Sequence, residues 1–404
     1  MTIAKGTSKQ VAYKKEGSGW GVIAGAAGAK YLRRVTSAFN LTKETYESGE
    51  IRTDKQISDF RHGVRSADGS LNGELSPGTY SDFMAAVVAK DFVAGGTTAS
   101  ASVTIAASGS FYTVTRSTGS WLTDGFFVGN VIRMTGAGLA PANVGNNLLI
   151  ASMTATVLTC VLLSGTALVA EGPIATVAVT SVGKQTYAPL TAHTDDSFTV
   201  EEWYSDIAQS EVYTGNKVGS MAVQLPATGL VTCDFTMMGK DLAQTGTSQY
   251  FTTPTAAGTS GIFASVAGAM VVDGLVVGLV TSMDFTVERG LEAANVVGSN
   301  SAADIFTGRI RVNGNFSTYF QDASFRGYFD NESTVSLVVA LTTGEEKAAD
   351  AVSFTFPKVK VGGFTKADGE LGIVADSSFV ALLNSDTATG LVASTIMIQD
   401  TTVA

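Results

Sequence analysis

The sequence predicts a mainly β fold that contains two tandem β-sandwich or barrel domains, each with a short flanking helix, and an inserted small all-β domain. Composition is the first reason: glycine occurs 44 times in 404 residues, above the usual roughly 7%, and only 15% of residues are charged. Many Thr, Ser and Val with few Lys and Glu favour strands and tight turns. A length of 404 residues suggests two or three domains.

A strand-and-turn pattern that occurs twice is the second reason. ADGSLNGELSPGTYSDF (67–83) aligns without a gap with VNGNFSTYFQDASFRGY (312–328), so that a polar-glycine turn and the apolar positions after it coincide. VTSAFNLTKE (35–44) similarly aligns, with one gap, with VTSMDFTVE (280–288). Two matches in the same order predict a domain duplication. The turn and core residues of the repeated motif are Gly69, Leu71, Leu75, Pro77, Tyr80, Gly314, Phe316, Phe320 and Phe325.

A long polar segment lies beside each copy of the motif, at 42–63 and at 287–308. Loops of this length inside compact domains usually serve a function. A solvated surface hairpin is one interpretation, and docking onto a neighbouring subunit or ring is the one that we favour, because both copies keep the segment. The charged residues proposed for this contact are Lys43, Glu44, Glu47, Glu50, Arg52, Asp54, Lys55, Asp59, Arg61, Glu288, Arg289 and Glu292.

SPGTYSDFMAAVVAKDF (76–92) gives the strongest helix signal. Ser76 is expected to cap the helix and Pro77 to occupy its first position. Tyr80, Phe83, Met84 and Val87 then share one apolar face. DASFRGYFDNES (322–333) predicts a shorter, weaker counterpart in the second copy.

An abrupt change of composition marks the inserted domain, which has almost no charge between 93 and 186 and reads as short strands with turns. Strands then resume at 197–239, with a counterpart at 333–382. Insertions are tolerated at exposed loop tips. The predicted organisation is an extended Lys-containing arm at 1–30, a first discontinuous domain at 31–92 and 187–250, the outward-facing insertion at 93–186, and a second domain at 251–404 with a C-terminal tail.

The sequence offers little chemistry for an active site, a metal or a cofactor, and an enzyme is not predicted. Its two cysteines, Cys160 and Cys233, lie in apparent strand interiors and with two histidines make no convincing zinc site. Glu201-Glu202 with Asp195-Asp196 lacks the oxygen spacing of a calcium loop and is interpreted as a solvated acidic edge. The formal net charge is −10, and no Lys/Arg cluster indicates tight binding of nucleic acid.

Residues 51–88 resemble the tail tube proteins of long-tailed, siphovirus-type bacteriophages. The segment reads IRTDKQISDFRHGVRSADGSLNGELSPGTYSDFMAAVV, and the similarity lies in its Asp-Lys-Gln start, its Gly-rich turn and its ELSPGTY run. GSWLTDGFFVGNVIRMTG (119–136) also resembles a β-module found in some of these proteins. The resemblance implies subunits whose inner strands pair into a continuous barrel around a lumen. Rings of such subunits stack through long loops and terminal arms.

The same resemblance implies the partners and the location of the chain. Its partners would be further copies of itself, the tape measure protein, and the tail terminator and baseplate proteins. Genomic DNA would pass through the lumen without specific binding during ejection into a bacterium. The protein would lie in the virion tail, after assembly in the host cytoplasm.

Duplication changes the expected symmetry of such a ring. If single-domain relatives form sixfold rings, a two-domain chain is expected to form a homotrimer with pseudo-sixfold symmetry. The insertion would then project outward three times per ring, where it decorates the virion or contacts the bacterial surface. A neutral or acidic lumen would let DNA slide, because a basic one would hold it. A tail-fibre or surface adhesin is the alternative function, and a polysaccharide-degrading enzyme is a third that would need a carboxylate pair in a cleft.

Overall fold

The structure is a computed structural model that describes residues 3–322, 324–368 and 370–404, and it is mainly β, as predicted. Its helical segments are η1 (Gly6–Ser8), α1 (Ser81–Val88) and α2 (Ser324–Asp330). The strands before the small barrel are β1 (Lys9–Lys15), β2 (Lys30–Tyr31), β3 (Thr36–Glu47), β4 (Phe60–Glu74) and β5 (Val93–Ala94). Those of the barrel are β6 (Thr97–Ser108), β7 (Phe111–Arg116), β8 (Val131–Thr135), β9 (Asn147–Met153), β10 (Val157–Ser164) and β11 (Glu171–Ser181).

The remaining strands belong to the body of the molecule. The first group is β12 (Lys184–Tyr187), β13 (Phe198–Tyr204), β14 (Gln209–Leu225), β15 (Thr232–Gly239), β16 (Asp241–Gly246), β17 (Gly268–Val272) and β18 (Leu275–Val276). The second group is β19 (Val280–Ala293), β20 (Ile305–Tyr319), β21 (Thr334–Thr342), β22 (Ala351–Lys366), β23 (Val374–Ala381) and β24 (Met397–Asp400).

Two sets of five strands pair in the same order. In the first set β3 pairs with β4, β4 with β15, β15 with β14, and β14 with β13. In the second set β19 pairs with β20, β20 with β23, β23 with β22, and β22 with β21. α1 follows β4 and α2 follows β20, so the helices occupy matching places in the chain.

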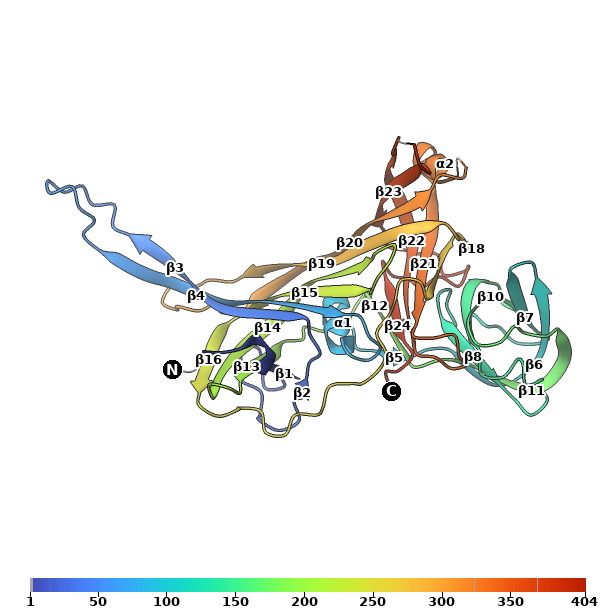
Figure 1. The fold of residues 1–404 in the computed structure, drawn as a ribbon, viewed down its shortest axis with the longest axis horizontal. Coiled ribbons are helices and arrows are strands. Elements are labelled where there is room, and N and C mark those ends of the chain that lie inside the picture. The colour runs from blue at the N-terminus through green and yellow to red at the C-terminus, as the bar shows by residue number, and fades with distance from the viewer. Residues whose placement is uncertain (1–2, 323, 369) are drawn as a thin grey trace.

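The two sets join edge to edge inside the chain. The C-terminal half of β14 pairs with β19, from Ser220 opposite Glu288 to Leu225 opposite Met283. A continuous sheet results, in the order β3-β4-β15-β14-β19-β20-β23-β22, which we call the long sheet. Figure 1 shows this sheet crossing the molecule from the β3–β4 hairpin to the β22–β23 end.

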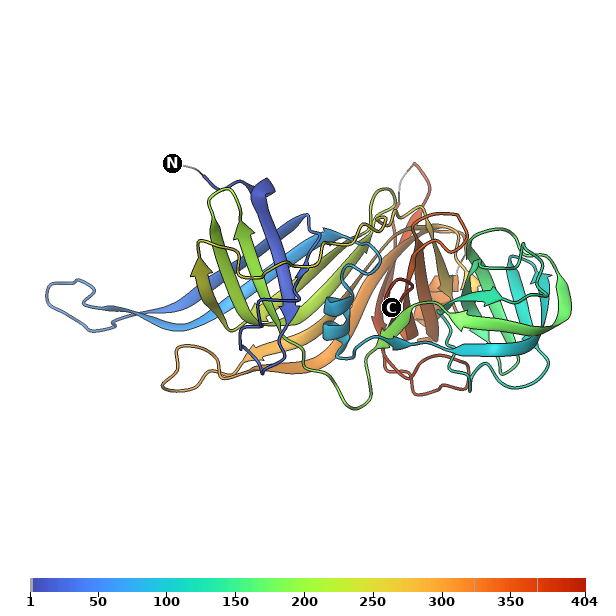
Figure 2. The same ribbon diagram turned by 90° about the horizontal axis from the view of Figure 1, so that it is seen from below.

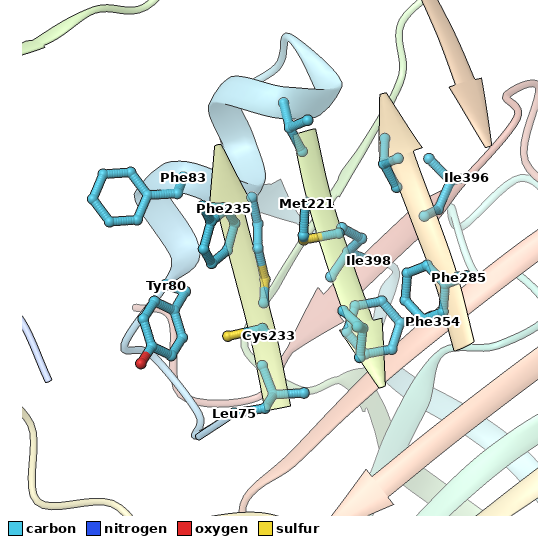
Figure 3. Close-up of a cluster of buried hydrophobic side chains, with 14 of the residues drawn as sticks. Leu75, Tyr80, Phe83, Met221, Cys233, Phe235, Phe285, Phe354, Ile396 and Ile398 are labelled. Atoms are coloured by element: carbon cyan, nitrogen blue, oxygen red, sulfur yellow. The ribbon is translucent and has the colours of Figure 1, made fainter. Parts of the chain in front are cut away.

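One core runs under the long sheet and spans both strand sets. α1 packs against one face of the sheet, with Tyr80 and Phe83 beside Phe235 of β15 (Figures 2 and 3). Further along, the ring of Phe285 lies 5.0 Å from that of Phe354 and 5.1 Å from that of Phe356. Both of these rings belong to β22, in the same strand set as Phe285. Across the seam Phe285 lies opposite Val223 of β14, which is also 0% exposed, so the two strand sets share buried apolar surface.

The residues of the repeated motif occupy comparable positions, with one difference between the sets. Gly69 lies against the ring of Phe39 and Gly314 against that of Phe379, so neither position has room for a larger side chain. The first set buries its apolar positions, Leu71, Leu75 and Tyr80, to 2% exposure or less. In the second set Phe316 is buried, but Phe325 is half-buried and Phe320 is 36% exposed. The apolar end of the second set is therefore partly uncovered.

The predicted start of the first helix is wrong. α1 begins at Ser81, four residues after Pro77, and Ser76 contacts the Thr79 hydroxyl at 2.7 Å instead of capping the helix. Gly78 has a φ of +72°, which a right-handed helix cannot accommodate, so residues 76–80 form a turn. The predicted apolar face is confirmed, because Tyr80, Phe83, Met84 and Val87 are all buried.

The N-terminal segment is not the extended arm that the sequence suggested. β1 pairs along the whole of β13 and with β2, and Val11, Ala12 and Tyr13 are buried. An apolar Val-Ala-Tyr run between lysines covers the edge of β13, which would otherwise leave backbone groups unpaired. The lysines of β1, Lys9, Lys14 and Lys15, lie at the two ends of this strand.

β6 to β11 close into a separate barrel, in the order β10-β7-β6-β11-β8-β9, at the end of the molecule away from the β3–β4 hairpin (Figure 2). The buried cluster of the barrel includes Trp121 and Phe126, and it continues into the body through Val338 and Ala340 of β21. The chain leaves the body after α1 and returns before β13, and there the Thr194 N–H donates to the Ala89 carbonyl at 2.9 Å. The two ends of this excursion therefore lie together, as in an insertion at a loop tip.

Candidate assembly surfaces

The β3–β4 hairpin projects from the body as a long arm (Figure 1). β3 continues to Glu47 and β4 begins at Phe60, so much of the predicted polar loop is extended strand. Ion pairs within the arm join Arg52 to Asp54 at 3.0 Å and Arg61 to Asp59 at 2.9 Å. The predicted contact residues of the first copy are all exposed here: Lys43, Glu44, Glu47, Glu50, Arg52, Asp54, Lys55, Asp59 and Arg61.

The second polar segment forms the end of the β19–β20 hairpin, whose tip lies against β4. The Arg65 N–H of β4 donates to the carbonyl of Asn300, in the β19–β20 tip, at 2.9 Å. Glu288 and Glu292 are exposed, as a contact surface requires, but Arg289 is 5% exposed. Arg289 donates to the Ala86 carbonyl of α1 at 3.0 Å and to the Thr194 carbonyl at 3.2 Å. The prediction that Arg289 lies on an exposed docking loop is therefore wrong, because its partners belong to the same chain.

An ion cluster sits where the two strand sets meet, with buried cations and carboxylates that are about half exposed. Lys217 of β14 is 1% exposed, and its Nζ donates to Asp195 at 2.6 Å, to Asp304 at 3.1 Å and to the Ile305 carbonyl at 2.8 Å. Arg289 adds a contact of 3.4 Å to Asp195. Burial lowers the pKa of Arg289, although Asp195 and Asp196 act in the opposite direction. The pairs fix β14, the β19–β20 hairpin and the segment before β13 to one another.

No direct signal for this cluster is present in the sequence, since Lys217 is a single cation within a strand. One signal was present, the Lys-Val-Gly run at 217–219 that recurs at 360–362. Lys360 contacts Glu332 at 3.1 Å, but both side chains are well exposed, at 41% and 82%.

The face of the long sheet opposite α1 carries polar side chains. Cross-strand hydrogen bonds join Asn72 to Asp234 at 2.6 Å and, at the matching place in the second strand set, Ser317 to Asp376 at 2.5 Å. Acidic side chains outnumber basic ones along this face. The acids are Asp68, Glu74, Asp234, Asp284, Glu288 and Asp376, and the bases are Arg309, Arg311 and Lys360. This polar, net acidic surface, which we call the open face, could not be located from net charge alone.

The acidic pair at 201–202 is not the solvated edge that the sequence suggested. Glu201 is 0% exposed and accepts hydrogen bonds from the Ser210 hydroxyl and from the N–H groups of Tyr250 and Phe251. Glu202 is 1% exposed and pairs with Lys9 at 2.6 Å. Buried carboxylates need such partners, and here they tie β13 to β1 and to the segment after β16.

Within the described residues, no three His, Cys, Asp or Glu side chains gather in a way that could hold a metal ion. Neither helix of the described chain is long and apolar enough to cross a membrane.

The described chain therefore combines a long sheet, a polar face on that sheet and a projecting hairpin arm. Residues 6–374 match the family model described as "Phage tail tube protein". The chain therefore belongs to the phage tail tube protein family and is a structural component of a phage tail. No curated protein matches it.

Proposed function

We propose that this chain assembles into stacked rings that form a tail tube, through which the genome passes into the host. The observation that carries the proposal is the repeated strand order together with the β14–β19 seam. The chain already contains one junction between two like units. A ring needs the same kind of junction between chains, and the two ends of the long sheet are the edges available for it.

These two ends have open strand edges in the part of the chain that the structure describes. β3 pairs on one side with β4, and β22 beyond Val361 pairs on one side with β23. Exposed edges of this kind promote pairing with another chain, and closing a barrel removes them. Ring formation therefore accounts for a feature that would be a liability in a monomer.

The two strand sets represent, in this proposal, two copies of one tube domain. The first is formed by 31–92 and 187–250, to which the pairing of β1 adds the N-terminal segment, and the second by 251–404. A homotrimer would then present six similar units around the lumen. The barrel within 93–186 is inserted in the first copy alone and would project outward three times per ring, in reach of the bacterial surface.

The open face is the surface that we assign to the lumen. DNA carries about one negative charge per 1.7 Å of helix axis, so a lumen rich in Asp and Glu repels it and disfavours tight binding. The exposed β3–β4 arm, with charges of both signs, would contact the neighbouring ring. The tape measure, terminator and baseplate proteins are the further partners that a tail tube requires.

Negative-stain electron microscopy of the purified chain tests this function. Hollow tubes or rings are the expected result, at neutral pH and moderate salt. A tail-fibre or adhesin protein, the alternative, would give discrete monomers or closed fibre-like particles under every salt condition, and that result would overturn the proposal.

A further inference from the structure

The two hairpins of the long sheet correspond residue by residue. β3–β4 and β19–β20 have the same irregularity, between Lys43 and Thr45 in one and between Arg289 and Leu291 in the other. At the hairpin end of β4, Asp59 Oδ1 accepts from the Phe60 N–H at 2.8 Å. At the same place in β20, Asp304 Oδ1 accepts from the Ile305 N–H at 2.7 Å. Asp59 therefore corresponds to Asp304, and Lys43 corresponds to Arg289.

The long bent strands also correspond. β14 has a register shift between Val218 and Ser220, and β22 has one between Val361 and Gly363, each just after a Lys-Val pair. Lys217 therefore corresponds to Lys360. The acid on each lysine matches too, because Asp195 lies three residues before Phe198, the first residue of β13 to pair with β14, and Glu332 lies three residues before Val335, the matching residue of β21.

The ion cluster is thus complete around Lys217, at the seam. Around Lys360, at the free end of the long sheet, only half of it is present. Lys217 has both carboxylates, from Asp195 and Asp304, and is 1% exposed. Lys360 is paired with Glu332, which corresponds to Asp195, and the Lys360 side chain is 41% exposed. Nothing corresponding to Asp304 and Arg289 lies beside Lys360 in the described chain. The residues that correspond to them, Asp59 and Lys43, are exposed on the arm at the opposite end of the long sheet.

We propose that the half cluster is completed by a second copy of this chain, an inference that rests on the proposed function. Residues 363–366 of β22 pair antiparallel with residues 39–42 of β3 in the partner subunit, in the register of the β14–β19 seam. Thr365 then lies opposite Asn40 of the partner subunit, as Ala222 lies opposite Thr286. Phe364 meets Leu41 of the partner subunit on the core side, as Met221 meets Val287.

The charged groups follow from the same register. Asp59 of the partner subunit approaches Lys360, and Lys43 of the partner subunit approaches Glu332. Phe364 and Leu41 are half-buried in the single chain, whereas Met221 and Val287 are 0% exposed, so apolar surface remains to be covered. The junction combines strand pairing, apolar contact and complementary charge, all three of which the seam already displays.

Cysteine cross-linking tests the register. The variant N40C/T365C places two thiols at directly opposed positions, where Cβ atoms of antiparallel strands lie about 4.5–5.5 Å apart. The control T42C/T365C shifts one thiol by two residues on the same face, to about 7–8 Å. Both native cysteines are 0% exposed, so mild oxidation of assembled rings reports on the introduced pair. Covalent trimers from N40C/T365C, with few from the control, are expected.

Charge reversal tests the cluster. K360E and D59K should each weaken lateral association at least about tenfold, which corresponds to about 1.4 kcal/mol, and K360E/D59K should recover most of it. Both side chains are exposed in the single chain, so its melting temperature should stay unchanged. K217E, the matched variant at the seam, should lower the melting temperature instead. D54K, at the tip of the arm, should leave lateral association intact.

The outcomes separate this inference from the proposed function. Rings that form normally in K360E and D59K, or that cross-link in T42C/T365C and not in N40C/T365C, would overturn the junction and leave the tube function standing. A wild-type chain that forms no rings at all would overturn both.

Discussion

Replacing Phe285 with alanine should destabilise the unassembled chain strongly, because this side chain is fully buried in the core, opposite Val223 at the seam. Phe285 is 0% exposed and packs edge-on or tilted against Phe354 and Phe356. Removing a buried Phe typically costs about 3–5 kcal/mol, and each aromatic pair contributes about 0.5–1.5 kcal/mol of that. Two such pairs place F285A in the upper part of this range.

The expected thermal shift follows from the length of the chain. With about 2.1 cal/mol/K of unfolding entropy per residue, 404 residues that unfold together give about 0.85 kcal/mol/K. F285A should therefore lower the melting temperature by about 4–6 °C. Calorimetry at concentrations too low for rings gives the measurement. F320A is the matched control, since Phe320 is 36% exposed and should cost no more than about 1 kcal/mol. Equal effects of the two variants would refute the placement of Phe285 in the buried core beside the seam.

Three further predictions concern single sites. In the barrel, hydrogen bonds from Thr98 and Arg116 lower the pKa of Asp124. The ionised carboxylate therefore adds to the free energy of unfolding. This stabilisation is fully present above the ordinary Asp pKa and is lost as pH falls through the lowered value. D124N should lower the free energy of unfolding by about 2–3 kcal/mol at pH 7, because the buried Arg116 loses its carboxylate partner. Urea titrations of D124N and the wild-type chain should show this difference in stability shrinking below about pH 4. A difference that stays constant with pH would contradict the prediction. G69V should lower the free energy of unfolding by about 1–3 kcal/mol, because a Cβ there overlaps the Phe39 ring. G278A, with open space around its Cβ, should leave the free energy of unfolding nearly unchanged in the same titration. Burial raises the pKa of both thiols, Cys160 and Cys233, so a thiol reagent should modify neither in the native chain and both after unfolding; fast native labelling would contradict their placement.

The mainly β fold was accessible from sequence because its signals are local. Glycines opposite aromatic rings, alternating apolar positions and a turn after each strand recur at 67–83 and 312–328, and the structure gives these segments the same strand pairing. The start of α1 was mispredicted for an equally local reason. Ser76-Pro77 has the composition of a helix start, but the positive φ of Gly78 delays the helix to Ser81.

The assembly surfaces were less accessible, because they depend on contacts between distant segments. Arg289 and Glu201 look like surface charges in sequence, and each is buried by partners from other elements. The strands of the long sheet alternate polar and apolar residues, a pattern that shows which residues share a face but not which face is covered. The Lys-Val-Gly repeat was visible, but its meaning required the ion cluster around Lys217.

The most direct test of the account is electron cryo-microscopy of assembled rings, resolved well enough to trace strands and count chains. Three chains per ring are predicted, with six similar densities around the lumen, alternating between the β14–β19 seam and the β22–β3 junction. Six full chains per ring, or a lumen wall in which β22 and β3 of neighbouring chains do not meet, would contradict the claim that the chain contains two copies of one ring-forming unit.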